Sequence, residues 1–312
     1  MSIEMPVQPP LSVVVRCSPA ARAATVLGDS WIQLILREMM TGPQRFSDLA
    51  ANLGISRAVL IERLRRMSDA GLVEQEPAQP NGVRRTYICT AKGADTIGIM
   101  LMQDAWERLY GAEDRVLALC DRDSGYPVQP VLLATPGGSA IEARRIGYVF
   151  DGECADVEHA SNARRRGESG QQVAELGAIS VLGDPWSWRI LIAAMLGVRR
   201  FDEFTDVLGI ASNVLTDRLS RLVEANLMLR ERYRRVPERY EYRMAVAGRA
   251  LHPLFCAMYG WGERWLYDGE PLPMRLFDRI TGARVSPVVC DAASGQPIDI
   301  RRLRRARVSI AA

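Results

Sequence analysis

The sequence predicts a mainly α-helical protein with small β-hairpins, an α+β fold that contains the same unit twice. First, the segment at residues 54–64 returns almost intact at residues 209–219, an offset of 155 positions. Second, each copy places leucines four residues apart and polar side chains opposite them, the pattern of a helix with one packed face. Third, glycine, asparagine and proline separate short helical and extended segments. Together these patterns favour two similar domains.

The composition is that of an ordinary globular protein. The chain has 312 residues, of which 48% are hydrophobic and 25% charged, so two domains could each bury a core. The net charge is only +3, but Lys92 is the only lysine, so the basic residues are almost all arginine. Arginine favours bidentate contacts to phosphate and guanine. Arginine-biased codons in a GC-rich genome would produce the same composition.

Several classes of protein are disfavoured. No basic leader precedes the apolar run at residues 11–15, which is too short for a signal peptide or a membrane span, so we expect a cytoplasmic protein with no membrane partner. Six cysteines without a C-x-x-C pair, and only two histidines, fit neither a metal site nor a disulfide framework. We expect no cofactor and no metal.

Each unit contains a helix-turn-helix followed by a hairpin. In the first unit Ser47 is expected to cap a helix that ends at Gly54, and Ser56 to cap the next helix, which runs to Ala70. Asn81-Gly82 between two extended runs then predicts a β-hairpin, which is a wing. The corresponding segments of the second unit are the helices at 201–208 and 211–225 and the wing at 229–244.

The repeat divides the chain into four parts. We expect an N-terminal extension at 1–16, a first winged helix-turn-helix domain at 17–150, a linker at 151–171 and a second such domain at 172–312. The linker is polar and has no hydrophobic period. Short apolar runs that alternate with Asp, Gly and Pro predict a β-hairpin appendage at the C-terminal end of each domain. The second appendage continues into an arginine-rich tail at 301–307.

These motifs resemble the HxlR-type winged-helix transcriptional regulators of bacteria. The resemblance depends on Leu-Gly-Asp-x-Trp at 27–31 and 182–186, Arg-Phe at 45–46 and 200–201, the helices at 55–64 and 210–219, and the segments at 87–93 and 242–248. It implies double-stranded DNA as the partner, with those helices as recognition helices. Members usually carry one domain and pair as homodimers through their terminal helices. This chain looks like a tandem form, which could be an intramolecular pseudo-dimer or a homodimer of tandem chains.

Reading DNA requires side chains that reach base edges and others that hold phosphates. The residues expected to contact DNA are Ser56, Arg57, Ala58, Ile61, Arg63, Arg66 and the wing residues Arg84 and Arg85 in the first unit, and Ser212, Asn213, Thr216, Arg218, Arg221 and the wing residues Arg234, Arg235 and Arg239 in the second. The arginines after the first turn of each recognition helix are expected near phosphates. The alternative is that these side chains form a solvated helix face and solvated hairpin tips. Because the two base-facing sets differ, the units should prefer different half-sites.

Two further features suggest regulation. The resemblance places Cys17 where family members often have a thiol that senses electrophiles or oxidants, with a silent cysteine as the alternative. All six tryptophans lie outside the recognition helices and are expected in the core or an interface. An aromatic pocket for a small-molecule effector between the units is the functional alternative.

The resemblance thus implies a sequence-specific DNA-binding transcriptional regulator, for which we expect repression, with activation as the open alternative. An enzyme is not expected, because the sequence contains no acid/base pair, metal cluster or nucleophile constellation. The alternative function is a ligand-sensing or protein-interaction module whose winged helices no longer bind DNA. The uncharged residues Ala58 and Ile61 on the first recognition helix favour that alternative.

Overall fold

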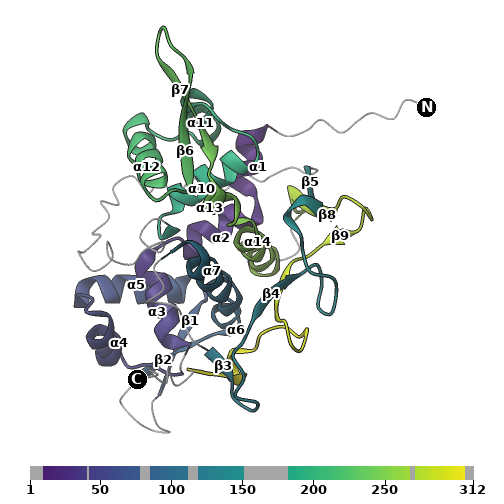
Figure 1. The fold of residues 1–312 in the computed structure, drawn as a ribbon. Helices are drawn as coiled ribbons and strands as arrows, with labels where there is room; N and C mark the ends of the chain where they lie inside the picture. The colour runs from purple at the N-terminus through teal and green to yellow at the C-terminus, as the bar shows by residue number, and fades with distance from the viewer. Residues whose placement is uncertain are drawn as a thin grey trace, which may run out of the picture.

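The computed structural model describes residues 10–40, 42–77, 85–111, 119–150, 182–267 and 271–305. Figure 1 shows the second unit at the top, the first unit at the lower left, and a group of short strands on the right. No helix in these described ranges is both long and apolar enough to cross a membrane.

The first unit is a winged helix-turn-helix flanked by further helices. Its elements are α2 (Pro19–Leu27), α3 (Ser30–Met39), α4 (Phe46–Leu53), α5 (Arg57–Asp69), β1 (Val73–Pro77), β2 (Arg85–Cys89), α6 (Ala91–Ala94) and α7 (Ile97–Tyr110). The expected cap at Ser47 is wrong, because α4 begins at Phe46 with Arg45 as its N-cap residue. The cap at Ser56 is confirmed, since its side chain accepts a hydrogen bond from the Val59 N–H.

The second unit repeats this order of elements. They are α10 (Pro185–Met195), α11 (Phe201–Leu208), α12 (Ser212–Glu224), β6 (Met228–Arg234), β7 (Arg239–Met244), α13 (Val246–Arg249) and α14 (His252–Leu266). In both units the turn before the recognition helix contains a glycine in the left-handed region, Gly54 with φ 60° and Gly209 with φ 61°. A side chain is strained at that φ, which explains glycine at both turns.

Residues 11–17, most of them in the expected N-terminal extension, form helix α1 (Leu11–Cys17). Val14 and Val15 are buried, and α1 contacts α10 and α11 of the second unit. The start of the chain therefore packs against the opposite unit. The linker expected at 151–171 lies outside the described residues.

The appendages expected as β-hairpins are confirmed as short antiparallel strands, but most of these strands pair across the two units rather than within one. These strands are β3 (Leu119–Asp121), β4 (Pro130–Leu133) and β5 (Ile146–Phe150) after the first unit, and β8 (Met274–Asp278), β9 (Arg284–Val285), β10 (Val288–Asp291) and β11 (Leu303–Arg305) after the second. The antiparallel pairs are β3 with β11, β4 with β10 and β5 with β8. Only β8 and β9 form a pair within one unit among the described appendage strands. The segment expected as a tail contains β11, so it belongs to this sheet system.

The cross-pairing follows a pseudo-twofold axis. In the appendages the repeat offset is 157, which makes Leu132 and Val289 equivalent, and these two residues face each other in the β4–β10 pair. The same symmetry relates β3–β11 to β5–β8. A contact in which each half presents the same patch is the arrangement of a C2 dimer. Here one chain makes that contact with itself.

Two tryptophans repeat this symmetry between the units. Trp106 on α7 donates its indole N–H to the Ala247 carbonyl at 2.8 Å, and Trp261 on α14 donates to the Lys92 carbonyl at 3.1 Å. Both donors and both acceptors are repeat equivalents at the offset of 155. Trp261 is fully buried, and α14 also packs along α2 and α7. The described helices therefore form one hydrophobic core that spans both units.

We call the packed contact between the two units, formed by the cross-paired strands and the helices α7 and α14, the joint. A buried histidine in this joint makes the free energy of unfolding depend on pH. His252 is 8% exposed, and burial lowers its pKa from the ordinary 6.5 to about 4. His252 therefore binds a proton more readily in the unfolded chain than in the folded one. The contribution of the neutral, buried His252 to the free energy of unfolding is complete above pH 6.5. It is lost as the pH falls towards 4, by up to roughly 3 kcal/mol. His252→Ile, which copies the equivalent Ile97, should remove this loss. Urea denaturation at pH 7 and pH 4.5 measures it, and an equal loss in both proteins would contradict the prediction.

Candidate nucleic-acid interface

The first recognition helix, α5, has one buried face and one exposed face. Leu60, Leu64 and Met67 are buried in the core. Residues from the helix start point outward: Ser56, Arg57 and Ala58 are exposed, and Ile61 is 55% exposed. An isoleucine this exposed on a helix otherwise anchored by leucines is available for apolar contact, for example with a thymine methyl group.

The second recognition helix, α12, has the same division but different exposed residues. Its buried residues are Leu215, Leu219 and Leu222. Ser212, Asn213 and Thr216 are exposed, the last with its hydroxyl donating to the Ser212 carbonyl at 2.8 Å. The two units therefore offer one face with a guanidinium beside apolar side chains and another with an amide beside hydroxyls.

A groove runs beside α5 and the first wing. It encloses about 880 Å³ that includes open solvent, and its lining includes Phe46, Arg57, Ile61 and Tyr87. The Arg57 guanidinium lies over the Phe46 ring, 5.1 Å from its centroid. This stacking holds the arginine at the mouth of the groove and leaves its N–H groups available to a ligand.

Three arginines that we expected near phosphates are bound within the protein. Arg63 forms an ion pair with Asp29 at 3.0 Å, and Arg66 binds the same carboxylate at 3.2 Å. In the second unit Arg218 binds Asp184 at 2.8 Å. Burial disfavours the charge on Arg218, but the Asp184 and Asp217 carboxylates outweigh it and raise its pKa. These arginines are therefore used to hold the recognition helices.

Asp29 and Asp184 are the residues that sequence reasoning missed as parts of the site. Each is also the N-cap residue of the helix before the helix-turn-helix, Asp29 accepting from the Trp31 and Ile32 N–H groups and Asp184 from the Ser187 N–H. One carboxylate thus fixes the start of that helix and the orientation of the recognition helix. The repeated Gly-Asp motif is visible in the sequence, but only the fold shows which arginines form ion pairs with its aspartate.

The remaining phosphate candidates lie on the recognition helix and wings. Arg221 is half exposed and pairs with Asp217 at 3.2 Å. Arg85 on the first wing is exposed, whereas Arg84 lies outside the described residues. On the second wing Arg235 and Arg239 are exposed without an ion pair among the described residues, and Arg234 donates to the Val236 carbonyl at 3.0 Å.

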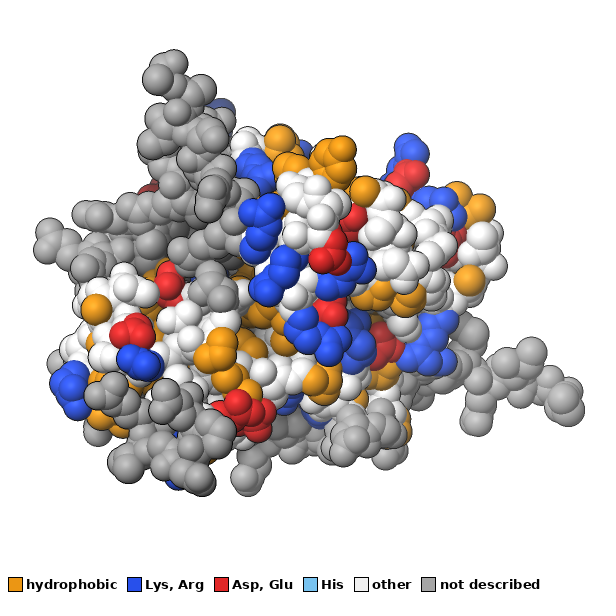
Figure 2. Space-filling view, turned by 90° about the horizontal axis from the view of Figure 1, so that it is seen from below, with side chains coloured by type: hydrophobic (Ala, Val, Ile, Leu, Met, Phe, Trp, Pro, Cys, Tyr) orange, Lys and Arg blue, Asp and Glu red, His pale blue; other side chains and the backbone are white. Residues whose placement is uncertain are grey.

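The face drawn in Figure 2 mixes basic and acidic side chains among its described residues. Figure 2 shows Lys and Arg side chains gathered in a band across one face, with Asp and Glu side chains among them. This agrees with the small net charge of +3. Attraction to a polyanion would therefore come from local arginines rather than from the charge of the whole protein.

The other residues singled out in the sequence have mixed positions. Cys17 is buried at the end of α1 and is disulfide-bonded, so it presents no free thiolate here, and its sensor role stays a prediction. Trp31, Trp106, Trp188 and Trp261 are buried, which confirms their expected packing role. Within the described ranges no cluster of His, Cys, Asp and Glu could hold a metal ion.

Two helices joined at a glycine turn, followed by a two-stranded wing, define the winged helix-turn-helix class. The chain belongs to the HxlR-like helix-turn-helix family, whose model matches residues 26–115 and again residues 181–270, more than half of the chain. It is accordingly a DNA-binding transcriptional regulator that carries the family's unit twice.

Each of the following relatives matches less than half of the chain. The uncharacterized HTH-type transcriptional regulator Rv3095 of Mycobacterium tuberculosis is 35% identical over 126 residues, which are 40% of this chain and 80% of the relative. The HTH-type transcriptional regulator YodB of Bacillus subtilis is 30% identical over 91 residues, 29% of this chain and 81% of the relative. A solved structure, that of PA1607, a putative transcription factor, has 36% sequence identity to this chain. The match covers 41% of this chain and 90% of the PA1607 chain, with a TM-score of 0.38.

Proposed function

We propose that one chain reads an asymmetric operator by placing α5 and α12 in two major grooves of one duplex. The observation that carries this proposal is the different chemistry of two equivalent faces, with Arg57 on α5 where α12 has Ser212, and Ala58 where α12 has Asn213. Arginine pairs with guanine and asparagine with adenine through two hydrogen bonds each. The two half-sites should therefore differ in sequence.

The pseudo-twofold joint supports the proposal that a single chain is the binding unit. In a C2 dimer on DNA the two recognition helices address major grooves about 34 Å apart, one helical turn of the duplex. The cross-paired strands and reciprocal tryptophan contacts give this chain the corresponding symmetry without a second copy. We propose one chain of 34.7 kDa per operator, and light scattering of the complex would measure that stoichiometry. Two chains per operator would favour the homodimer of tandem chains.

The wings are proposed to hold the DNA backbone. Arg85, Arg234, Arg235 and Arg239 are exposed, and Arg84, which lies outside the described residues, directly precedes Arg85 in the sequence. Arg63, Arg66 and Arg218 are assigned to positioning the recognition helices through Asp29 and Asp184, and Arg221 to phosphate contact. Repression is the proposed outcome, because a protein bound at a promoter is sufficient to block transcription from it. A promoter–reporter fusion tests whether transcription falls or rises when the protein binds.

Selection from a random DNA pool, followed by gel shifts on the selected operator, tests sequence reading. Arg57→Ala and Asn213→Ala should each weaken binding about 5- to 150-fold, the cost of about 1–3 kcal/mol for one bidentate base contact. Each variant should also lose specificity in one half-site only. Arg144→Ala is the matched control, because Arg144 is 84% exposed on the appendage and far from either recognition helix in sequence.

Wild-type affinity in both variants would remove α5 and α12 from the interface. Binding should also weaken steeply as salt is added, and Arg235→Ala should lower the slope by about one unit. If the pool yields no enriched sequence at all, the alternative function is favoured, a ligand-sensing or protein-interaction module. The exposed Ile61 is the observation that supports that alternative.

A further inference from the structure

The second wing ends in an apolar tip. Its strands β6 and β7 form a hairpin that stands out from the rest of the second unit (Figure 1), and every residue of β6 after Met228 is exposed. At the tip Val236 is 82% exposed, more than any other large hydrophobic side chain that the structure describes, and Pro237 follows it. Hairpin tips in water usually carry Gly, Asn or Asp. The composition of this tip is therefore not the one that water favours.

The described carboxylates of the wing are paired with arginines of its strands. Glu238 forms an ion pair with Arg232 at 3.1 Å. Arg243 reaches Glu231 at 3.3 Å and Glu241 at 2.6 Å, so one guanidinium neutralises two carboxylates that lie opposite each other in the hairpin. The negative charge of the wing is thus compensated within the wing.

The arginines at the tip have no such ion pair among the described residues. Arg234 and Arg239 lie directly opposite each other in the β6–β7 pair, and like charges at opposed positions destabilise an antiparallel pair. Arg235 is exposed beside them. Phosphates placed among these guanidinium groups would remove the repulsion. The tip therefore combines an apolar centre with uncompensated positive charge, which fits duplex DNA, whose phosphates border stacked bases.

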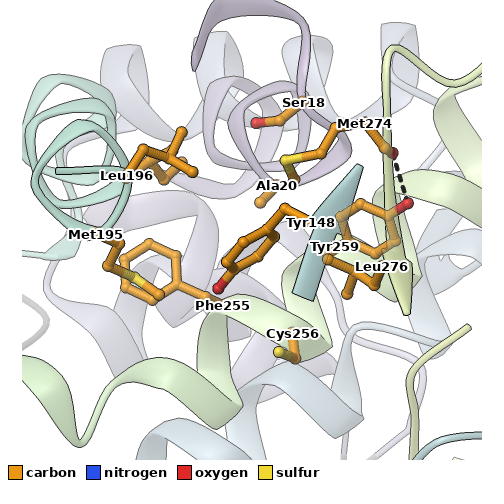
Figure 3. A pocket seen from close by; sticks show the side chains of 11 residues that line it. Ser18, Ala20, Tyr148, Met195, Leu196, Phe255, Cys256, Tyr259, Met274 and Leu276 are labelled. Atoms are coloured by element: carbon orange, nitrogen blue, oxygen red, sulfur yellow. Dashed lines mark hydrogen bonds between the residues drawn. The ribbon is translucent and has the colours of Figure 1, made fainter. Parts of the chain in front are cut away.

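The wing stands on a tightly packed base. β6 packs against α12, and β7 packs against α10. The end of α10 in turn packs across the joint, where Tyr148 from β5, Met195 from α10 and Phe255 from α14 close around a pocket of only about 40 Å³ (Figure 3). Ligand sites enclose about 300 Å³ or more, so side chains fill most of this space. A close-packed base deforms little, so the hairpin can hold a bound duplex in a bent shape.

The exposed part of the hairpin is long enough to reach a second groove. Residues 229–234 of β6 span roughly 20 Å at about 3.3 Å per residue. One helical turn of DNA is about 34 Å, so a minor groove lies about 17 Å along the axis from the major groove beside it. That minor groove is only about 6 Å wide. It admits the tip of a hairpin but not both of its strands.

We propose that Val236 inserts into a base step from the minor groove next to the half-site read by α12, and that the operator bends at this step. Apolar wedges of this kind unstack one step and kink the duplex by about 20–90° toward the major groove. Arg234, Arg235 and Arg239 hold the phosphates on either side. TA and CA steps unstack most easily, so we expect one about half a turn, or roughly five base pairs, from the bases contacted by α12. The place of the wedge on the operator rests on the proposed function, whereas the wedge itself does not.

Energy transfer between dyes at the two ends of the selected operator measures the bend. The wild-type protein should bend the operator by at least about 20°. Val236→Ser should abolish the bend, because a hydroxyl group cannot replace an apolar wedge, and Val236→Leu should retain it. Val246→Ser is the matched control and should bend the operator like wild type, because Val246 is 64% exposed on α13, outside the wing. A bound but straight operator with the wild-type protein, or an equal bend with Val236→Ser, would overturn the wedge and leave base reading by α12 intact.

Unstacking is measured separately, on DNA that contains no selected operator. The probe is an alternating A–T duplex in which 2-aminopurine, whose fluorescence rises when it unstacks, replaces one adenine. At low salt, where electrostatic attraction maintains non-specific binding, saturation with wild-type protein or Val246→Ser should raise the fluorescence. Val236→Ser should bind, as the anisotropy of a labelled duplex reports, without that rise. If no operator can be selected, the proposed function fails and this assay decides the wedge. No rise with the wild-type protein, or an equal rise with Val236→Ser, overturns it.

Base substitutions at the bent step identify the groove. Inosine·cytosine pairs present the same minor-groove acceptors as A·T pairs, whereas G·C pairs add the guanine amino group. Inosine·cytosine pairs at this step should therefore retain most of the bend, and G·C pairs should reduce it. An equal reduction by both substitutions would place Val236 outside the minor groove and overturn the proposal.

Discussion

Asp104→Ala is expected to lower the free energy of unfolding by about 3–5 kcal/mol, the cost of removing one partner of a buried ion pair. The Asp104 side chain is 1% exposed on α7, and it pairs with the Arg37 guanidinium on α3. The variant removes this carboxylate from the buried Arg37 guanidinium. The loss is costly because the surrounding core does not supply water in its place. Urea denaturation with linear extrapolation measures the loss.

The second unit supplies the matched control for this prediction. At the equivalent positions it has Ile192 and Tyr259, so the double variant Arg37→Ile with Asp104→Phe replaces both charges by apolar side chains. Replacement of a whole buried pair by apolar residues is often close to neutral. The double variant should therefore be more stable than Asp104→Ala by about 2 kcal/mol. A double variant less stable than the single one would show that the ion pair itself contributes net stability.

Trp261→Ala is expected to cost about 3–5 kcal/mol, the range for truncation of a large buried aromatic side chain. Trp261 is 0% exposed, and its indole N–H reaches the Lys92 carbonyl of the other unit. The variant thus leaves a cavity in the joint between the units and a backbone carbonyl without its donor. Trp106→Ala, the repeat equivalent, should have an effect of similar size.

Trp261→Phe separates the two contributions, because it keeps a ring and removes the N–H donor. Its cost should be nearer the roughly 1–3 kcal/mol of one unsatisfied buried group. Calorimetry also reports whether both units unfold in one transition, as one shared core requires. If Trp261→Ala is no more costly than Trp261→Phe, the ring does not contribute to the joint as described.

Local patterns in the chain were sufficient for the elements of each unit. The repeat at residues 54–64 and 209–219 and the leucine spacing of α5 and α12 identified both recognition helices, whose buried faces are confirmed. Ser56 and Gly54 were sufficient for the start of α5 and for the turn before it, because caps and left-handed glycines act over a few residues. The family followed from the order of these motifs.

Contacts between distant residues could not be read in this way. Arg63 and Arg218 have the spacing of phosphate-binding residues on an exposed helix, yet they bind Asp29 and Asp184, which lie 34 positions earlier in the chain. Sequence period places a side chain on a helix face but does not show which other element covers that face. The same limit concealed the pocket beside Tyr148, whose walls come from both units.

The repeat itself explains the division between local and tertiary information. Period, caps and turns are properties of neighbouring residues, so two winged units with different exposed residues on their recognition helices follow from the amino-acid order alone. Partner choice is different, because two near-copies of a strand can pair within their own unit or with the other. Only burial in the tertiary structure selects between these pairings, and it selects the pseudo-twofold joint with Leu132 opposite Val289.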